Sequence, residues 1–306
     1  SWIFILEGLF TILCAIASYW IIDDFPETAK FLTEPEKVFV IRRLRADMQY
    51  SAGGEKFKMK YIWQSLKDWK TYLAMGIYMG FDGPLFAFSL FTPTIIDQVS
   101  FKATAANLLS VPVYVWACIV TVIVGFMGDR LGHRGYINLY VVRLVGYIIL
   151  ITSQNAALSY FACFLAASAI YPTVPAINHR AWVAGNVEGA YKRSVTLAMA
   201  IGFGNINGAV SSNVYRAEDA PWYRLGHGII LAYIAIGWIS SLLFMILLRV
   251  ENARRDRGER DEVICGKDDQ PGSESNLKAA KNGRFESIDA ARREKGDEWS
   301  GFRYSL

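Results

Sequence analysis

The sequence contains few of the features on which soluble enzymes and metalloproteins depend. Its three histidines, His133, His179 and His227, are too scattered along the chain to ligate one metal ion. Its four cysteines form no pair with metal-binding or redox spacing. A phosphate-binding Walker loop is absent, which argues against transport driven by ATP. The sequence therefore predicts no catalytic residues, no cofactor and no metal site.

Charge is also scarce. Acidic and basic residues make up 20% of the 306 residues, and the formal net charge is +4. This excess is modest and confined to particular segments. Basic loops that face anionic lipid headgroups explain it better than a nucleic-acid-binding surface does. We therefore expect a lipid bilayer rather than a nucleic acid as the partner.

Apolar sequence, by contrast, is abundant. Hydrophobic residues account for 53% of the chain, aromatic residues for 14%, and the mean hydropathy is +0.23. Several apolar runs are about twenty residues long, which is the length of a helix that crosses the hydrocarbon core of a bilayer. These observations predict an all-α polytopic membrane protein.

Seven apolar runs are predicted to cross the membrane. The first covers residues 2–22, and a long polar segment, residues 23–70, separates it from the others. The other six runs cover residues 71–96, 105–126, 136–152, 156–177, 195–215 and 227–249. Residues 250–306 form a polar tail that we expect to be largely disordered, with a short helix near residues 286–294.

The loops between the runs alternate in their content of Lys and Arg. Basic residues gather in residues 128–135, in residues 178–194 and in the tail, whereas the intervening loops contain fewer. Because basic loops remain on the cytoplasmic side, the long polar segment and the C-terminus are predicted to be cytoplasmic.

One basic loop, from Gly125 to Arg134, contains a distinctive spacing of residues. Gly125 and Gly132 allow close backbone approach or a positive φ. Asp129 can accept hydrogen bonds from N–H groups at a helix start, while Arg130 and Arg134 favour the cytoplasmic side. An ordinary basic loop would explain these charges equally well. The spacing G-x-x-x-D-R-x-G-H-R, however, resembles the signature loop of major facilitator superfamily transporters.

Further stretches resemble one branch of that superfamily, the fungal anion:cation symporters that include the allantoate permease-like proteins. They are Asp24-Phe-Pro-Glu27, Thr92-Pro-Thr-Ile-Ile96, Gly202-Phe-Gly-Asn205, Ala220-Pro-Trp-Tyr223 and Phe302-Arg-Tyr304. The resemblance implies that residues 1–22 are the last helix of an N-terminal bundle. It also implies that residues 23–70 are the central linker, residues 71–249 the six-helix C-terminal bundle, and residues 250–306 a cytoplasmic tail. The chain would then be N-terminally truncated.

The same resemblance implies a function. Members of this branch take up small organic anions or vitamin-like nutrients together with protons, by alternating access of a site near the middle of the bilayer. The resemblance places such a protein in the plasma membrane. It also implies that the loop from Gly125 to Arg134 gates the transporter against the missing N-terminal bundle.

The main candidate for the transport site is an acidic residue inside a predicted span, Asp82. Asp82 lies near the middle of its run, where a charge costs about 3 kcal/mol unless it faces water or a partner. Tyr78 lies one turn before it on the same helical stripe, and Gly83 and Pro84 would weaken the helix there. Asp82 and Tyr78 are therefore predicted to belong to a substrate or proton pathway. A packing role for Asp82, hydrogen-bonded to neighbouring helices, is an equal alternative.

Four other residues are candidates for lining that pathway. Asn205 and Asn207 are two residues apart and point to different faces of a helix, so that one can face a cavity and the other a helix interface. Tyr114 and Tyr171 each lie close to a proline, at a predicted kink. For either tyrosine alone, core packing is the simpler interpretation.

Alternatives remain open for the whole chain. A seven-helix receptor would have the same number of spans and the same orientation, although the sequence contains neither D-R-Y after the third span nor N-P-x-x-Y in the seventh. A nutrient sensor built on the transporter fold, or a truncated product without transport activity, would show the same sequence features.

Overall fold

The structure is a computed structural model. It describes residues 2–22, 29–46, 58–98, 103–131, 142–153, 155–172, 182–219, 223–264 and 281–306. These residues are predominantly helical, and the chain is an all-α polytopic bundle, as predicted. It divides into two units, Ser1–Lys56 and Phe57–Leu306, which are described separately.

The first unit contains two helices. α1 (Trp2–Ile21) is largely apolar and corresponds to the first predicted span. α2 (Glu34–Ala46) begins with a capping box, because the carboxylate of Glu36 accepts hydrogen bonds from the backbone N–H of Thr33 at 2.9 Å and from its hydroxyl at 2.7 Å. This contact satisfies a backbone donor at the helix start that would otherwise have no partner.

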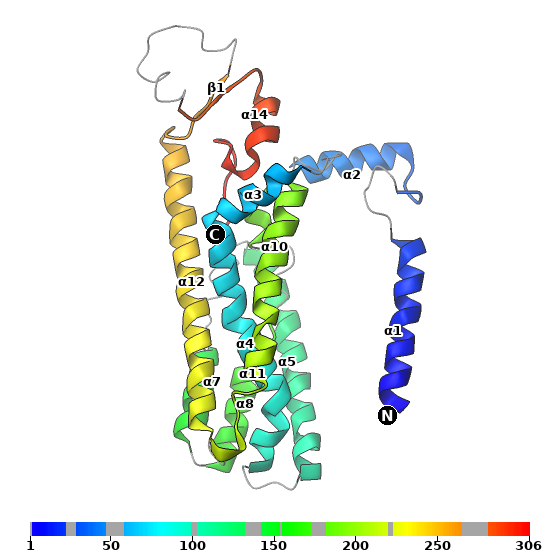
Figure 1. Cartoon of the computed structure of the whole chain (residues 1–306), viewed down its shortest axis with the longest axis vertical. Helices are drawn as coiled ribbons and strands as arrows, with labels where there is room; N and C mark the ends of the chain where they lie inside the picture. Colours follow the sequence, from blue (N-terminus) through cyan, green and yellow to red (C-terminus); the bar gives the residue numbers. More distant parts are fainter. Residues whose placement is uncertain are drawn as a thin grey trace. The chain divides into compact units, whose positions relative to one another are not determined.

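The second unit is built from helices of different lengths that run side by side (Figure 1). They are α4 (Trp69–Gln98), α5 (Ala103–Leu131), α7 (Val142–Thr152), α8 (Ala156–Ile170), α10 (Ala190–Asn205), α11 (Asn207–Ser211) and α12 (Arg224–Asp256). Among the described helices, three are long and apolar enough to cross a membrane, over Trp69–Thr92, Leu108–Met127 and Arg224–Asp256. α1 and α8 contain shorter apolar stretches.

α4 is the central helix of this unit and packs against α5, α8, α10, α11 and α12. Two close approaches explain how the neighbours fit around it. Gly80 of α4 and Gly237 of α12 face each other with no room for a Cβ on either residue, and Gly204 of α10 accommodates the ring of Tyr78 in the same way. Small residues thus allow helix backbones to approach where lipid supplies no hydrophobic driving force.

Several helix boundaries differ from the prediction. α5 continues through Leu131, so the segment from Gly125 to Leu131 is helical rather than a loop. A Cβ on Gly125 would meet nothing within 4 Å, so the expected close backbone approach does not occur there among the described residues. A helix leaving the membrane satisfies its own backbone hydrogen bonds and need not end where the apolar run ends. For the same reason α12 continues through Asp256, and its 33 residues span about 50 Å.

The single predicted span over residues 195–215 is divided. α10 ends at Asn205, Ile206 forms a turn, and α11 follows. α8 ends at Ile170, where Tyr171 and Pro172 form a turn, and residues 173–181 lie outside the described part of the chain.

The tail differs from the expectation of disorder in residues 250–264 and 281–306. It contains β1 (Val263–Ile264) paired in parallel with β2 (Arg284–Phe285), then α14 (Ile288–Lys295) and the 3-10 turn η3 (Gly296–Glu298). α14 confirms the short helix expected near residues 286–294. Phe302 and Tyr304 are buried, which shows that the tail has enough apolar and aromatic contacts to be ordered despite its polar composition.

Candidate functional site

Asp82 is buried in α4, with 4% of its surface exposed. Its Oδ2 atom has no hydrogen-bond partner among the described residues. Leaving such an atom unpaired costs about 1–3 kcal/mol, and more when the group is charged. The packing alternative requires a partner for this oxygen, and the described part of the chain supplies none.

α11 brings a second unpartnered polar group to the same region of α4. Asn207 is 4% exposed, and its Nδ2 atom, like Asp82 Oδ2, has no hydrogen-bond partner among the residues described. Ser211, one turn later on α11, donates a hydrogen bond of 3.1 Å to the carbonyl oxygen of Gly83. Because Gly83 follows Asp82, this bond holds α11 against α4 beside the acid. We call these two residues the Asp82–Asn207 site.

The two predicted asparagines have different environments. Asn205 is exposed and ends α10, whereas Asn207 is buried and begins α11. The turn at Ile206 separates them. An exposed amide in a membrane-spanning region is costly in lipid, which favours a position of Asn205 against water or another helix.

Tyr78 lies one turn before Asp82 on α4. Its ring packs on Gly204 near the end of α10, and it lies 4.7 Å from the ring of Phe81, centroid to centroid. Tyr78 therefore fixes α10 against α4 immediately before the turn that leads to Asn207. This contact makes it a positioning residue for the Asp82–Asn207 site.

Tyr114 and Tyr171 form a separate group. Their ring centroids are 5.9 Å apart at an interplanar angle of 83°, and Tyr171 Oη lies 3.1 Å from Ser89 Oγ. Ser89 follows Asp82 by seven residues on α4, a rise of about 10 Å along the helix. The predicted pathway residues thus fall into two groups at different levels of the bundle.

The predicted gating residues are only partly described. Gly125 and Arg130 lie near the end of α5 and are exposed. Asp129 belongs to the same helix, but its side chain, as well as Gly132 and Arg134, lies outside the described residues. The gating role of this segment therefore stays a prediction.

His227 is a core residue. It is 3% exposed, and its Nδ1 atom lies 2.9 Å from Tyr215 Oη. The described residues contain no group of three side chains that could hold a metal ion. The histidine is thus partnered by a tyrosine within the bundle.

A buried ionic cluster that the sequence did not predict lies at one end of the bundle. Asp68, Lys70, Lys192 and Asp297 come together where α4 and α10 begin and α12 ends, which we call the tail end. Each lysine lies within 3.0 Å of both aspartates. Asp68 and Lys70 are close in the sequence, but Lys192 and Asp297 are distant from them and from each other, so only an unusual density of charge beside apolar runs could have pointed to the cluster.

The whole chain was compared with known proteins. No family model matches it. An uncharacterized transporter of Schizosaccharomyces pombe is 31% identical over 272 residues, which cover 87% of this chain and 54% of the relative. A major facilitator-type transporter of Emericella nidulans is 28% identical over 272 residues, with the same coverage of 87% and 54%. A high-affinity nicotinic acid transporter of Saccharomyces cerevisiae is 29% identical over 231 residues, which cover 75% of this chain and 43% of that protein.

The chain spans about half the length of the curated relatives it matches. These relatives are named as transporters, which favours the transporter interpretation over a seven-helix receptor or an enzyme. The helical bundle and the similarity over most of the chain together support membership of the major facilitator superfamily.

Proposed function

We propose that the protein acts in secondary active transport, taking up a small organic anion or vitamin-like nutrient together with protons. The observation that carries the proposal is the buried carboxylate of Asp82, whose Oδ2 atom lacks a hydrogen-bond partner among the described residues. Asn207 Nδ2, on the helix α11 that packs against α4, also lacks one in the same part of the chain. Intramembrane acids of this kind are typical of proton pathways in transporters. The similarity to named transporters supports the same interpretation.

Protonation of Asp82 would serve two purposes. It removes a charge that is costly at this depth, and it removes the repulsion between the acid and an anionic substrate. The proton would therefore bind before the anion or together with it. The amide of Asn207 can then donate a hydrogen bond to a substrate carboxylate or to the acid itself. Release of the proton on the other side would restore the repulsion and favour release of the anion.

Tyr114 and Tyr171 provide a second contact region in this proposal. Aromatic faces and the Ser89–Tyr171 hydrogen bond suit a planar substrate that carries a polar group. The similarity to a nicotinic acid transporter makes an aromatic monocarboxylate a suitable first probe.

Alternating access requires a second bundle that rocks against this one. We place the segment from Gly125 to Arg134 at that interface, as a gate between the two bundles on the cytoplasmic side. By the distribution of basic loops we orient the tail end and the C-terminus toward the cytoplasm, in the plasma membrane.

The test measures uptake of radiolabelled nicotinic acid and of a panel of small organic acids by yeast cells that express the protein. Uptake of at least one compound should rise at low external pH and fall when a protonophore is added. Asp82→Asn should abolish this dependence. The control Glu218→Gln removes an exposed carboxylate in the short 3-10 turn η2 (Ala217–Asp219) and should leave uptake unchanged.

Two outcomes would contradict the proposal. If neither the protonophore nor the loss of the Asp82 carboxylate changes the uptake rate, proton coupling through this residue is excluded. A signalling response to a nutrient without any uptake would favour a sensor on the same fold.

A further inference from the structure

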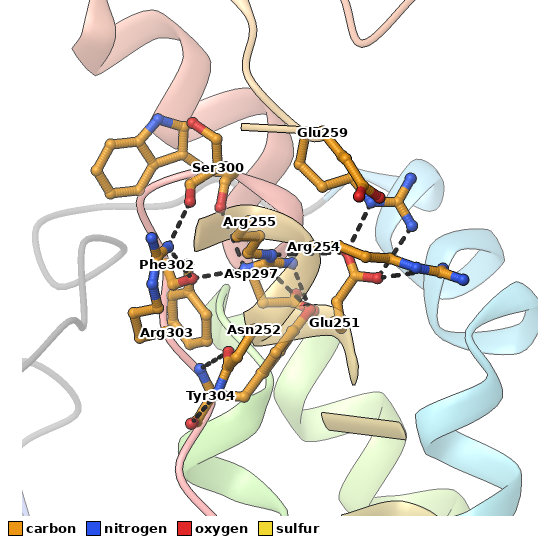
Figure 2. Close-up of polar contacts among 12 residues, drawn as sticks. Glu251, Asn252, Arg254, Arg255, Glu259, Asp297, Ser300, Phe302, Arg303 and Tyr304 are labelled. Carbon is orange, nitrogen blue, oxygen red and sulfur yellow. Dashed lines mark hydrogen bonds and ion pairs between the residues drawn. The ribbon is translucent and has the colours of Figure 1, made fainter. Parts of the chain in front are cut away.

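The end of the chain is bound to three helices of the bundle at the tail end, away from the Asp82–Asn207 site. Residues 297–305, which we call the C-terminal clamp, contact side chains from the beginnings of α4 and α10 and from the last turns of α12. Figure 2 shows the part of these contacts that involves α12.

A closed ring of charges fixes the first residue of the clamp. Asp297 is fully buried, with Oδ2 2.7 Å from Lys70 Nζ on α4 and Oδ1 2.9 Å from Lys192 Nζ on α10. Asp68 Oδ2, in the turn before α4, lies 3.0 Å from Lys70 Nζ and 2.7 Å from Lys192 Nζ. The ring contains two cations and two anions, so it carries no net charge. Such a buried ring is stable only while it is complete.

Arg255 of α12 binds the backbone of the clamp. Its guanidinium donates hydrogen bonds to the carbonyl oxygens of Asp297 at 2.9 Å, Phe302 at 2.7 Å and Trp299 at 3.2 Å (Figure 2). The guanidinium carbon lies 4.4 Å from the centroid of the Tyr304 ring, which adds a cation–π contact. One arginine therefore binds three backbone carbonyl groups of the clamp.

Two asparagine side chains bind the backbone of Tyr304 and Ser305, each through a pair of hydrogen bonds like those between neighbouring β-strands. Asn252 of α12 accepts from the backbone N–H of Tyr304 and donates to its carbonyl oxygen, both at 2.9 Å. Asn186, in the 3-10 turn η1 (Ala184–Asn186), makes the same pair of bonds with Ser305, at 2.8 and 2.9 Å. In the clamp these bonds use only backbone groups. They therefore fix the position of the clamp but do not require particular side chains at residues 304 and 305.

Asp297 and Lys192 stabilise each other's charged forms. Burial by itself raises the pKa of Asp297, but the ammonium groups of Lys70 and Lys192 lower it more, so the pKa lies below the usual carboxyl range. Burial lowers the pKa of Lys192, and Asp297 and Asp68 raise it above the usual lysine range despite the opposing charge of Lys70. Neither group changes its charge near pH 7, which argues against a pH-operated release of the clamp.

We infer that the C-terminal clamp is a permanent part of the bundle that makes the tail ends of α4, α10 and α12 move as one rigid body. The ion pairs and hydrogen bonds given above join the clamp to these three helices and the adjoining turns. Conformational change at this end of the bundle then takes place by movement of α5, α7 and α8 against that body. A tail that detaches and rebinds is the competing description.

The first test compares hydrogen–deuterium exchange of the purified protein with that of Asp297→Asn. The substitution leaves two buried ammonium groups with one carboxylate. Exchange at the beginnings of α4 and α10 and at the end of α12 should rise together, by about tenfold or more. The matched control is Asp256→Asn, since Asp256 pairs with Arg303 at 3.0 Å but both side chains are well exposed. The control should change none of the three helices.

The result that overturns the inference is increased exchange confined to residues 281–306 while the three helix ends keep their protection. The tail would then be a passive layer on the bundle. The double variant Lys192→Gln with Asp297→Asn keeps the ring neutral, because it removes one cation together with one anion. It therefore separates the loss of the clamp contacts from misfolding caused by an excess buried charge. It should be less protected at the three helix ends than the unmodified protein and more protected than Asp297→Asn.

The second test links the clamp covalently. An ideal Cβ on Gly185 would lie 3.9 Å from Ser305 Oγ, so Gly185→Cys and Ser305→Cys can form a disulfide after a small side-chain adjustment. The four native cysteines are first replaced by serine. A permanent clamp should give the same exchange at the three helix ends in the oxidised and reduced states. Exchange that slows about tenfold on oxidation would show that the clamp detaches in the resting protein. Neither test uses a transport substrate, so failure of the transport proposal leaves both results valid.

Discussion

Gly80→Ala tests how α4 and α12 are packed against each other. A Cβ at this position would lie 2.5 Å from the backbone nitrogen of Gly237 and 2.9 Å from the carbonyl oxygen of Tyr233. Non-bonded heavy atoms pack at about 3.5 Å, so the two helices would have to separate by roughly 1 Å. Because the obstructing atoms are backbone, no side-chain rotation relieves the clash.

The cost of this separation can be approximated from the packing. A gap of that size removes a quarter to a half of the dispersion energy along the interface, and overpacking of this kind costs about 2–3 kcal/mol. For a protein of this size the melting temperature should fall by about 5–10 °C. The assay is thermal unfolding in detergent, followed by tryptophan fluorescence.

Two further variants make the prediction specific. Gly228→Ala is the matched control on α12, because its Cβ would meet nothing within 4 Å, and it should be neutral or slightly stabilising. Gly237→Ala should also be harmful, but less so than Gly80→Ala, because its Cβ would lie 2.7 Å from Gly80 Cα and at least 3.2 Å from the other nearby atoms. The double variant should cost less than the sum, since the helices need to separate only once. A stable Gly80→Ala protein, or equal damage from Gly228→Ala, would refute this account of the interface.

Three other predictions follow from the same structure. Because the pKa of Asp297 lies below its ordinary value, the extra thermal stability of the unmodified protein over Asp297→Asn should be present above about pH 4 and disappear as the pH falls further, in melting curves measured across that range. Asn207→Ala should reduce proton-dependent uptake at least about tenfold while changing the melting temperature little, because the amide nitrogen that it removes has no hydrogen-bond partner among the described residues. An equal loss of uptake and stability would indicate a packing role. Asp129→Asn in the protein as encoded by its gene should change the transport rate more than the amount inserted in the membrane, measured by uptake and by immunoblotting; equal losses would contradict a gating role.

Much of the fold was predictable because its signals are local. Apolar runs of about twenty residues located the helices that became α1, α4, α5 and α12, since length and composition alone decide whether a helix can span a bilayer. The capping box of Glu36 and Thr33 was predictable for the same reason, because its partners are three residues apart.

Helix ends and the pathway residues were predicted less well. The interpretation of residues 125–134 as a loop was wrong for the part up to Leu131, because an apolar boundary marks the edge of the membrane and not the end of a helix. Nothing in the sequence indicated that the candidate residues Tyr114 and Tyr171 lie next to each other. Their rings come together because α5 packs beside the turn that follows α8.

The sequence by itself determined which segments are apolar enough to be helices in a membrane, and where an acid must lie within one of them. The tertiary structure decided which polar groups remain without a partner among the described residues, because Asp82 and Asn207 are more than a hundred residues apart and only the packing of α11 on α4 brings their helices together. It also decided that residues 250–264 and 281–306 of the tail are ordered. The ring that joins Lys70 to Asp297 closes between the beginning of one helix and the end of the chain, and charges so distant in sequence show no pattern that composition or periodicity could reveal.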